Sequence, residues 1–123
     1  MNVQMPAAFV DGVALFNAGR FFEAHEAFEE LLDDVEEDAR WDLLVALIQV
    51  AVGYHKWTSG HPGAARMLGL GLEKLAAFPD VAWGIDVGTL RARVAGDRAA
   101  AEGAMTPMTR APRIVLIEPP APG

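Results

Sequence analysis

The stretch Ala39–Thr58 reads ARWDLLVALIQVAVGYHKWT, and it decides the fold. Apolar residues fall on nearly every side of a helix built from this stretch, and a helix without a polar face is normally central to its domain. The polar positions Asp42, Gln49 and Lys56 lie seven residues apart in one narrow stripe, a pattern typical of a strip that faces solvent. The sequence therefore predicts a central helix around which the other elements pack.

Four further helices are predicted from apolar spacing and from proline and glycine punctuation. They cover about Pro6–Ala18, Phe21–Val35, Pro62–Phe78 and Val87–Ala101. Short connections join the first helix to the second and the third to the fourth, so the chain is expected to form two helical hairpins. Asp86 is suited to cap the last helix.

A proline-rich tail follows, in which Arg113–Ile117 is an apolar island between prolines. No sheet is predicted that the island could join, so we expect it to lie extended along the bundle or along a neighbouring subunit. The fold class is thus all-α: a compact bundle of about five helices built from two helical hairpins, with an extended proline-rich C-terminal tail. We expect residues 1–104 to form the bundle domain and residues 105–123 the tail.

Length and composition bound the class of protein. The 123 residues suffice for one hydrophobic core, and 52% apolar with 22% charged residues is typical of a globular domain. The absence of cysteine excludes disulfides and thiolate zinc sites and is compatible with a reducing compartment, so we expect a cytoplasmic protein. No cationic stretch leads into an apolar run at the start, and the apolar run Leu43–Tyr54 is shorter than the roughly 20 residues that cross a bilayer. Neither secretion nor a membrane span is predicted.

Charge is distributed unevenly along the chain. The net charge of −7 argues against nucleic-acid binding, which needs clustered lysine and arginine. Nine of the seventeen acidic residues lie between Glu23 and Asp38 with no lysine or arginine among them, whereas residues 91–113 carry five arginines. The acidic run is either a solvated helix face or a docking surface for a cationic partner or for the chain's own arginine-bearing tail.

The two hairpins share a weak internal echo. Phe16-Asn-Ala-Gly19, Ala24 and Leu31 recur 41 residues later as Trp57-Thr-Ser-Gly60, Ala65 and Leu72. The pattern resembles a tetratricopeptide unit, although the period is longer than the usual ~34 residues. Both glycines are equally explained as helix stops, so a true repeat is one of two interpretations.

A helical wheel of the second helix separates a buried from a solvated side. The residues Phe21, Ala24, Phe28, Leu31, Leu32 and Val35 share one arc, with Phe22 apart from it. His25 and Glu29 lie four residues apart at the border of this arc, and His55 points inward from the third helix. We therefore expect His25 and Glu29 to be mostly buried and within hydrogen-bonding reach of each other or of Gln49.

Three interpretations of these polar residues stay open. They form a structural hydrogen-bonded network, or His25, Glu29 and His55 bind a divalent metal such as zinc or iron, or they perform acid–base catalysis. The segment His25–Glu29 looks like a zincin helix whose second histidine is replaced by glutamate. His61, next to a proline at a helix start, is expected to be an exposed turn residue.

Several segments of the chain also resemble a known family. The segments Phe16–Asn17, Phe21–Glu29, Leu47–Ala51 and Gly60–Ala64 are similar to those of the family called domain of unknown function 309. That family is a small helical bundle of bacteria and archaea without an established activity. The resemblance covers roughly residues 10–78, and its most specific part is the core Phe-Glu-Ala-His-Glu at Phe22–Glu26.

The resemblance implies a set of signature polar residues. By position these are Asn17, His25, Glu26, Glu29 or Glu30, Gln49 and His55. It also implies that Gln49 is a partner for the His25–Glu29 pair, although the wheel alone places Gln49 toward solvent. Two departures are visible: Asp33-Asp34 stand where the family usually has a tryptophan, and His61 stands where it has an asparagine.

The sequence thus favours a small helical-hairpin interaction or binding module, with His25, Glu26, Glu29, Gln49 and His55 as its candidate binding residues. The alternative is a metal-binding protein or a small metal-dependent enzyme that uses His25, Glu29 and His55. Partners are expected to be proteins, including a second copy of this chain in a homodimer, because an exposed apolar island at residues 114–117 needs a cover.

Two glycines of the fourth predicted helix need an explanation, since each costs about 1 kcal/mol relative to alanine in a helix. On the wheel Gly71 lies in the buried arc and Gly69 on the outer face. We expect Gly71 to allow a close approach of the third helix, and Gly69 to have no such function.

Overall fold

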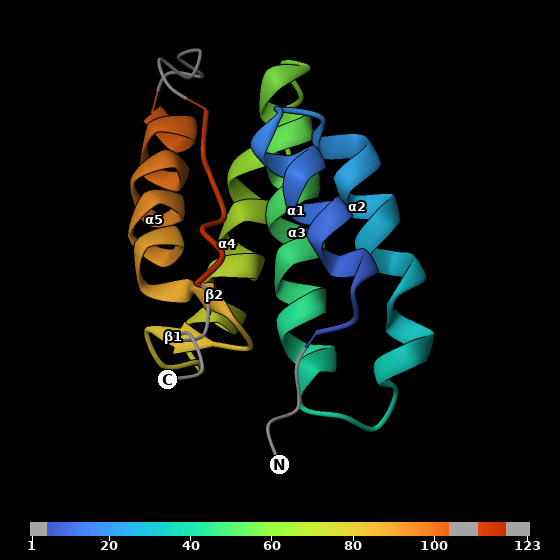
Figure 1. Cartoon of the computed structure of the whole chain (residues 1–123). Helices are drawn as coiled ribbons and strands as arrows, with labels where there is room; N and C mark the ends of the chain where they lie inside the picture. Colours follow the sequence, from blue (N-terminus) through green and yellow to red (C-terminus); the bar gives the residue numbers. More distant parts are fainter. Residues whose placement is uncertain (1–4, 104–110, 118–123) are drawn as a thin grey trace.

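The computed structural model describes residues 5–103 and 111–117 of the chain. The described residues form five α-helices, one short 3-10 helix and a two-stranded hairpin (Figure 1). In chain order these are α1 Ala8–Asn17, α2 Phe21–Glu30, η1 Leu32–Val35, α3 Arg40–Thr58, α4 Ala64–Leu75, β1 Val81–Ala82, β2 Ile85–Asp86 and α5 Val87–Gly103. The all-α bundle built from two helical hairpins is confirmed.

Helix α3 is the centre of the bundle, as the sequence predicts. It packs against both α2 and α4, while α1 packs on α2 and α5 on α4. Its fully buried side chains include Leu43, Leu44, Leu47, Val50 and Tyr54. The Tyr54 hydroxyl donates a hydrogen bond to the Asp97 carboxylate, which ties α3 to α5, and burial raises the pKa of Tyr54.

The first helix of each hairpin, α1 or α3, ends in the same way. Gly19 and Gly60 have φ values of 80° and 71°, the left-handed region that glycine adopts without strain. After α1 the amide of Arg20 donates to the Leu15 carbonyl, and after α3 the amide of His61 donates to the Lys56 carbonyl. These bonds, with those of the glycine amides, are Schellman caps that stop each helix and let the chain reverse.

Three other glycines lie inside helices where a side chain of the neighbouring helix takes their space. A Cβ on Gly12 of α1 would lie 2.6 Å from the Phe28 ring of α2. Across the α3–α4 contact, a Cβ on Gly53 would lie 2.7 Å from Leu68, and one on Gly71 would lie 2.6 Å from Val50. The close approach expected at Gly71 is confirmed, and two further glycines share its function.

The expectation for Gly69 is wrong. This glycine is buried rather than on the outer face, and a Cβ there would lie 3.0 Å from the guanidinium carbon of Arg98 on α5. The wheel placed it correctly with respect to α3 but could not show that α5 covers the opposite side of α4. The neighbour is the end of a long side chain, which can move more easily than backbone.

The second predicted helix is shorter than expected. Helix α2 ends at Glu30, and Leu32–Val35 continues as the 3-10 turn η1. Its apolar residues stay inside, because Leu31 and Val35 are buried, although Leu32 is only half-buried. Phe22 stands apart from the buried arc as predicted, with 46% of its surface exposed.

The tail joins a small sheet, which corrects the expectation that no sheet was present. The two-residue strands β1 and β2 form a hairpin whose turn residues, Trp83 and Gly84, both have positive φ. The tail residue Leu116 pairs antiparallel with Ile85 of β2. In Figure 1 the red tail segment runs beside α5 toward β2, so the predicted extended path along the bundle is confirmed for residues 111–117.

The start of α5 also follows the sequence. Asp86 accepts hydrogen bonds from the Thr89 amide at 3.0 Å and from the Thr89 hydroxyl at 2.7 Å, so it caps the helix as predicted. These bonds hold the pKa of the Asp86 carboxyl below its usual value. Among the helices of the described residues, none combines the length and the apolar character that crossing a membrane requires.

The glycine contacts lead to a prediction about stability. Gly71→Ala will lower the free energy of unfolding by about 1–3 kcal/mol, because the added methyl meets the α3 backbone at Ala46 and Val50 as well as a side chain. The matched control is Gly96→Ala in α5, where a Cβ meets nothing within 4 Å; it will stabilise by up to about 1 kcal/mol. Urea unfolding of the two variants measures both values, and a stabilised Gly71→Ala would contradict the close α3–α4 contact.

Candidate functional site

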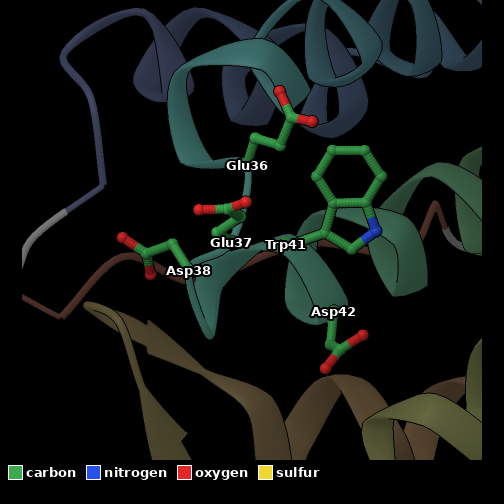
Figure 2. Close-up of a pocket in the computed structure, with 5 residues that line it drawn as sticks. All are labelled: Glu36, Glu37, Asp38, Trp41 and Asp42. Atoms are coloured by element: carbon green, nitrogen blue, oxygen red, sulfur yellow. The ribbon is translucent and has the colours of Figure 1, made fainter.

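A pocket of about 380 Å³ lies where η1 leads into α3. Glu36, Glu37, Asp38, Trp41 and Asp42 line it. In Figure 2 the Glu36 side chain and the Trp41 indole lie on the upper side of the pocket, whereas the Asp38 and Asp42 carboxylates point away from the indole. The last residues of the acidic run are therefore exposed or half-exposed and border an open pocket together with an aromatic ring.

The connection between η1 and α3 positions these residues. Val35 is buried and anchors the end of η1, after which Glu37 adopts a φ of 67°. A residue with a side chain is strained in that region by roughly 1–2 kcal/mol relative to glycine. Asp38 then caps α3, since its carboxylate accepts a hydrogen bond from the Arg40 amide at 2.9 Å.

The charge of the pocket is only partly compensated. The Arg40 guanidinium donates to Asp38 at 2.7 Å, and this pairing holds the pKa of the Asp38 carboxyl below its usual value. Within residues 5–103 and 111–117 no ion pair engages Glu36, Glu37 or Asp42. Carboxylates grouped beside a half-exposed indole create a negative potential next to an aromatic surface. Such a pocket is suited to a cationic group.

The predicted histidine site has a different geometry. The ring of Phe22 contacts both imidazoles, with centroid distances of 4.9 Å to His25 and 5.3 Å to His55. His25 Nδ1 lies at hydrogen-bonding distance from the Phe22 carbonyl, so this nitrogen is the donor of the pair. Both histidines thus pack on the same phenylalanine ring.

The expected burial of Glu29 is wrong. Its side chain is 55% exposed, while that of His25 is only 16% exposed. The closest approach between His25 Nε2 and Glu29 Oε2 is 4.0 Å, which is beyond hydrogen-bonding distance. Glu29 lies at the border of the helical wheel, and no donor covers it, so its carboxylate stays in water rather than lose hydration. Glu26 is also exposed.

Gln49 does not join the His25–Glu29 pair as the resemblance implies. Its side chain is half-buried, and Oε1 is shielded from solvent without a hydrogen-bond partner. The wheel is also only partly right about the solvent stripe, because Asp42 is exposed whereas Gln49 and Lys56 are half-buried. Among the polar residues of α3, His55 contacts Phe22 of α2, whereas Gln49 makes no hydrogen bond to α2 within the described part of the chain.

The described residues contain no group of three or more histidine, aspartate or glutamate side chains arranged to hold a metal ion. His25, Glu29 and His55 are accordingly not brought together as a ligand set. His61 is exposed as predicted, and its Nδ1 accepts a hydrogen bond from the Gly63 amide at 2.9 Å just before α4. His61 thus accepts a backbone hydrogen bond at the start of α4.

One signature residue, Asn17, has a contact that the sequence did not reveal. Its side-chain amide makes two hydrogen bonds to the backbone of Ile114, which is 97 positions away in sequence. Sequence reasoning also missed the pocket at Trp41. The available signals were the end of the acidic run and a large aromatic in the first turn of α3, but neither shows that the surface is concave.

Part of the chain matches the model of a known family. The profile of the family Domain of unknown function (DUF309) matches residues 9–68, from α1 to the first turns of α4. The resemblance inferred from the sequence is therefore confirmed, and the match contains all residues of the Trp41 pocket. No curated protein matches the chain in sequence.

The exposure of Glu29 predicts that its removal has little effect on stability. Glu29→Ala will change the free energy of unfolding by less than about 0.5 kcal/mol, the same as Glu30→Ala, because both carboxylates are solvated. Phe28→Ala on the same helix is the positive control and will cost about 3–5 kcal/mol. Urea denaturation of the three variants tests this, and a loss above about 2 kcal/mol for Glu29→Ala alone would mean that its carboxylate has a buried partner.

Proposed function

We propose that this chain, which matches the DUF309 family model over residues 9–68, is a helical-hairpin interaction module that binds a cationic segment of a partner protein. The binding site is the Trp41 pocket. One observation carries the proposal: a concave surface of about 380 Å³ combines a half-exposed indole with three carboxylates that have no ion-pair partner among the described residues.

The chemistry of the pocket favours an arginine or lysine side chain over other ligands. A cation above an indole is stabilised by roughly 0.5–2 kcal/mol, depending on how far it is desolvated. The surrounding acidic run, from Glu23 to Asp38, adds a negative potential that accelerates encounter with a basic segment. An anionic or nucleic-acid ligand would be repelled by the same charges.

The chain's own arginines support an external partner. Arg91 pairs with Asp80, Arg93 with Asp97 and Arg98 with Glu102. Each of these arginines therefore serves the region around α5 rather than the acidic run. Arg113 lies on the docked tail segment, and Arg110 lies outside the described residues.

Metal-dependent chemistry at His25, Glu29 and His55 is the weaker candidate. It needs three ligands on one ion, and the described residues contain no group of three such side chains arranged to hold a metal ion. We therefore retain the interaction module, and we place it in the cytoplasm because a chain without cysteine suits a reducing compartment.

Binding to the pocket is tested with hexalysine and hexaglutamate peptides. Hexalysine will quench or shift Trp41 fluorescence and bind more weakly as salt is raised, whereas hexaglutamate will not bind. Trp41→Ala will weaken hexalysine binding by about 3–30-fold in calorimetry, the loss of one cation–aromatic contact. The Glu36→Gln/Asp42→Asn double variant will weaken it further.

The matched control removes the same charge elsewhere. The Glu26→Gln/Glu30→Gln double variant lies on α2 outside the pocket and will reduce binding by less than about threefold. If the two double variants weaken hexalysine binding equally, the interaction is with the net charge of the protein and the proposed pocket is wrong.

The strained residue Glu37 provides a second prediction. Glu37→Gly will leave the free energy of unfolding unchanged or raise it by up to about 1 kcal/mol, because glycine adopts the positive φ without strain. The same variant will weaken hexalysine binding, since it removes one carboxylate from the pocket. Thermal unfolding and calorimetry measure the two effects, and a variant with lower stability and unchanged binding would contradict the proposed use of Glu37.

A further inference from the structure

The tail segment 111–117 occupies a slot between the end of α1 and the strand β2. On one side, the Asn17 side chain accepts a hydrogen bond from the Ile114 amide at 2.7 Å and donates one to the Ile114 carbonyl at 2.9 Å. A neighbouring β-strand would make the same two hydrogen bonds with its backbone, and here the Asn17 side-chain amide makes them. It fixes the register of the tail at one residue.

The other side of the same segment pairs with β2 and its turn. The Asp86 amide donates to the Val115 carbonyl at 2.9 Å, and the Ile117 amide donates to the Gly84 carbonyl at 2.8 Å. These bonds flank Ile85 and Leu116 as a non-hydrogen-bonded antiparallel pair. All four hydrogen bonds of the slot therefore go to the backbone of the tail.

Side chains of the tail also contribute to its binding in the slot. Ile114 is 1% exposed and Pro112 is also buried, so alternate residues of an extended segment point into the bundle. Backbone pairing combined with pockets for alternate side chains is the way in which a sheet edge receives an added strand. The slot is thus a receptor for an extended peptide, and in this structure its occupant is the chain's own tail.

We propose that the slot also receives the tail of a second copy of this chain, so that two copies exchange residues 111–117 and form a homodimer. The contacts in the slot depend only on residues 111–117, so the same segment from another copy can make the same contacts. Intrachain and exchanged docking are therefore equal in slot contacts. Exchange is favoured when additional contacts between the two copies exceed the entropy lost on association.

The docked tail leaves apolar side chains that supply this contact. Val115, Leu116 and Ile117 are 44%, 40% and 39% exposed, although they follow the fully anchored Ile114. Val81 of β1, which is 55% exposed, lies in the same cross-strand row as Asp86 and Val115. In a single copy Val81 and Val115 stay largely in water on the same face of the sheet, on either side of Asp86, and exchange of tails would let the exposed apolar side chains of two copies meet around a twofold axis.

This inference does not rest on the proposed function, because none of the slot residues lines the Trp41 pocket. Loss of hexalysine binding leaves tail exchange untouched, and a monomeric protein can still bind hexalysine. The two proposals therefore fail separately.

Cross-linking tests the exchange directly, since the chain contains no cysteine. The single variants Ile85→Cys and Leu116→Cys are mixed, dilute oxidant is added, and disulfide-linked dimers are mapped by mass spectrometry. A non-hydrogen-bonded antiparallel pair has the geometry for a disulfide, and in this mixture it forms only when the tail of one copy occupies the slot of another. We expect the 85–116 link to dominate.

The matched control pairs Ala82→Cys with Leu116→Cys. Ala82 is more accessible than Ile85 but lies on the far side of β2, so random collision favours the control whereas exchange favours position 85. We expect at least about tenfold more of the 85–116 link. The Ile85→Cys/Leu116→Cys double variant in one chain shows that the slot is intact. If that chain closes an internal disulfide while the mixture of single variants gives no 85–116 link, the proposal is overturned.

Sedimentation of the full chain gives an independent measurement. We expect a dimer that dissociates on dilution, and Val81→Lys will shift it toward monomer because it places a charge where the two rows meet. Val10→Lys, at a residue of α1 with a similar exposure of 51%, will not shift it. A chain that stays monomeric at the highest concentration, or a dimer equally weakened by both variants, overturns the proposal.

Discussion

The structure depends on three glycine contacts that let neighbouring helices approach closely. Gly12 accepts the Phe28 ring, Gly53 accepts Leu68, and Gly71 accepts Val50. A glycine inside a helix costs about 1 kcal/mol of stability relative to alanine, and here the close packing that it permits offsets this cost. These contacts hold α1 close to α2 and α3 close to α4. The helix ends themselves are set locally, by Gly19 after α1 and by the Asp38 carboxylate before α3.

Close packing leaves no room for polar side chains in the centre. Among the described residues, no polar or charged residue is fully buried, and the core is aliphatic and aromatic. Polar side chains therefore lie on exposed helix faces, in partly buried pairs such as Tyr54–Asp97, or at helix ends and connections. Both surfaces to which we assign binding lie there: the pocket at the η1–α3 connection, and the slot between the α1 end and the β1–β2 hairpin.

Local sequence signals predict the helices well because their causes are local. The apolar circumference of Ala39–Thr58, the helix stops at Gly19 and Gly60, and the cap at Asp86 all operate within a few residues. The slot has no such signal, since Asn17 and Ile114 are 97 positions apart and meet only after the bundle forms. The predicted burial of Glu29 is wrong for another reason. Its position on the helical wheel lies at the border of the buried arc, and at such a position the neighbouring elements decide whether a side chain is buried or exposed.

The two surfaces differ in what they recognise, and the fold keeps them apart. The pocket acts through charge and an aromatic face, so its strength depends on salt, whereas the slot acts through backbone hydrogen bonds and buried apolar side chains, which salt screens little. Helix α2 separates them: Asn17 precedes Phe21, and Glu36 follows Glu30 and η1. The ten residues of α2 alone span about 15 Å. A partner bound at Trp41, as we propose, would therefore leave the tail slot open, and the two proposed interactions are compatible in one protein.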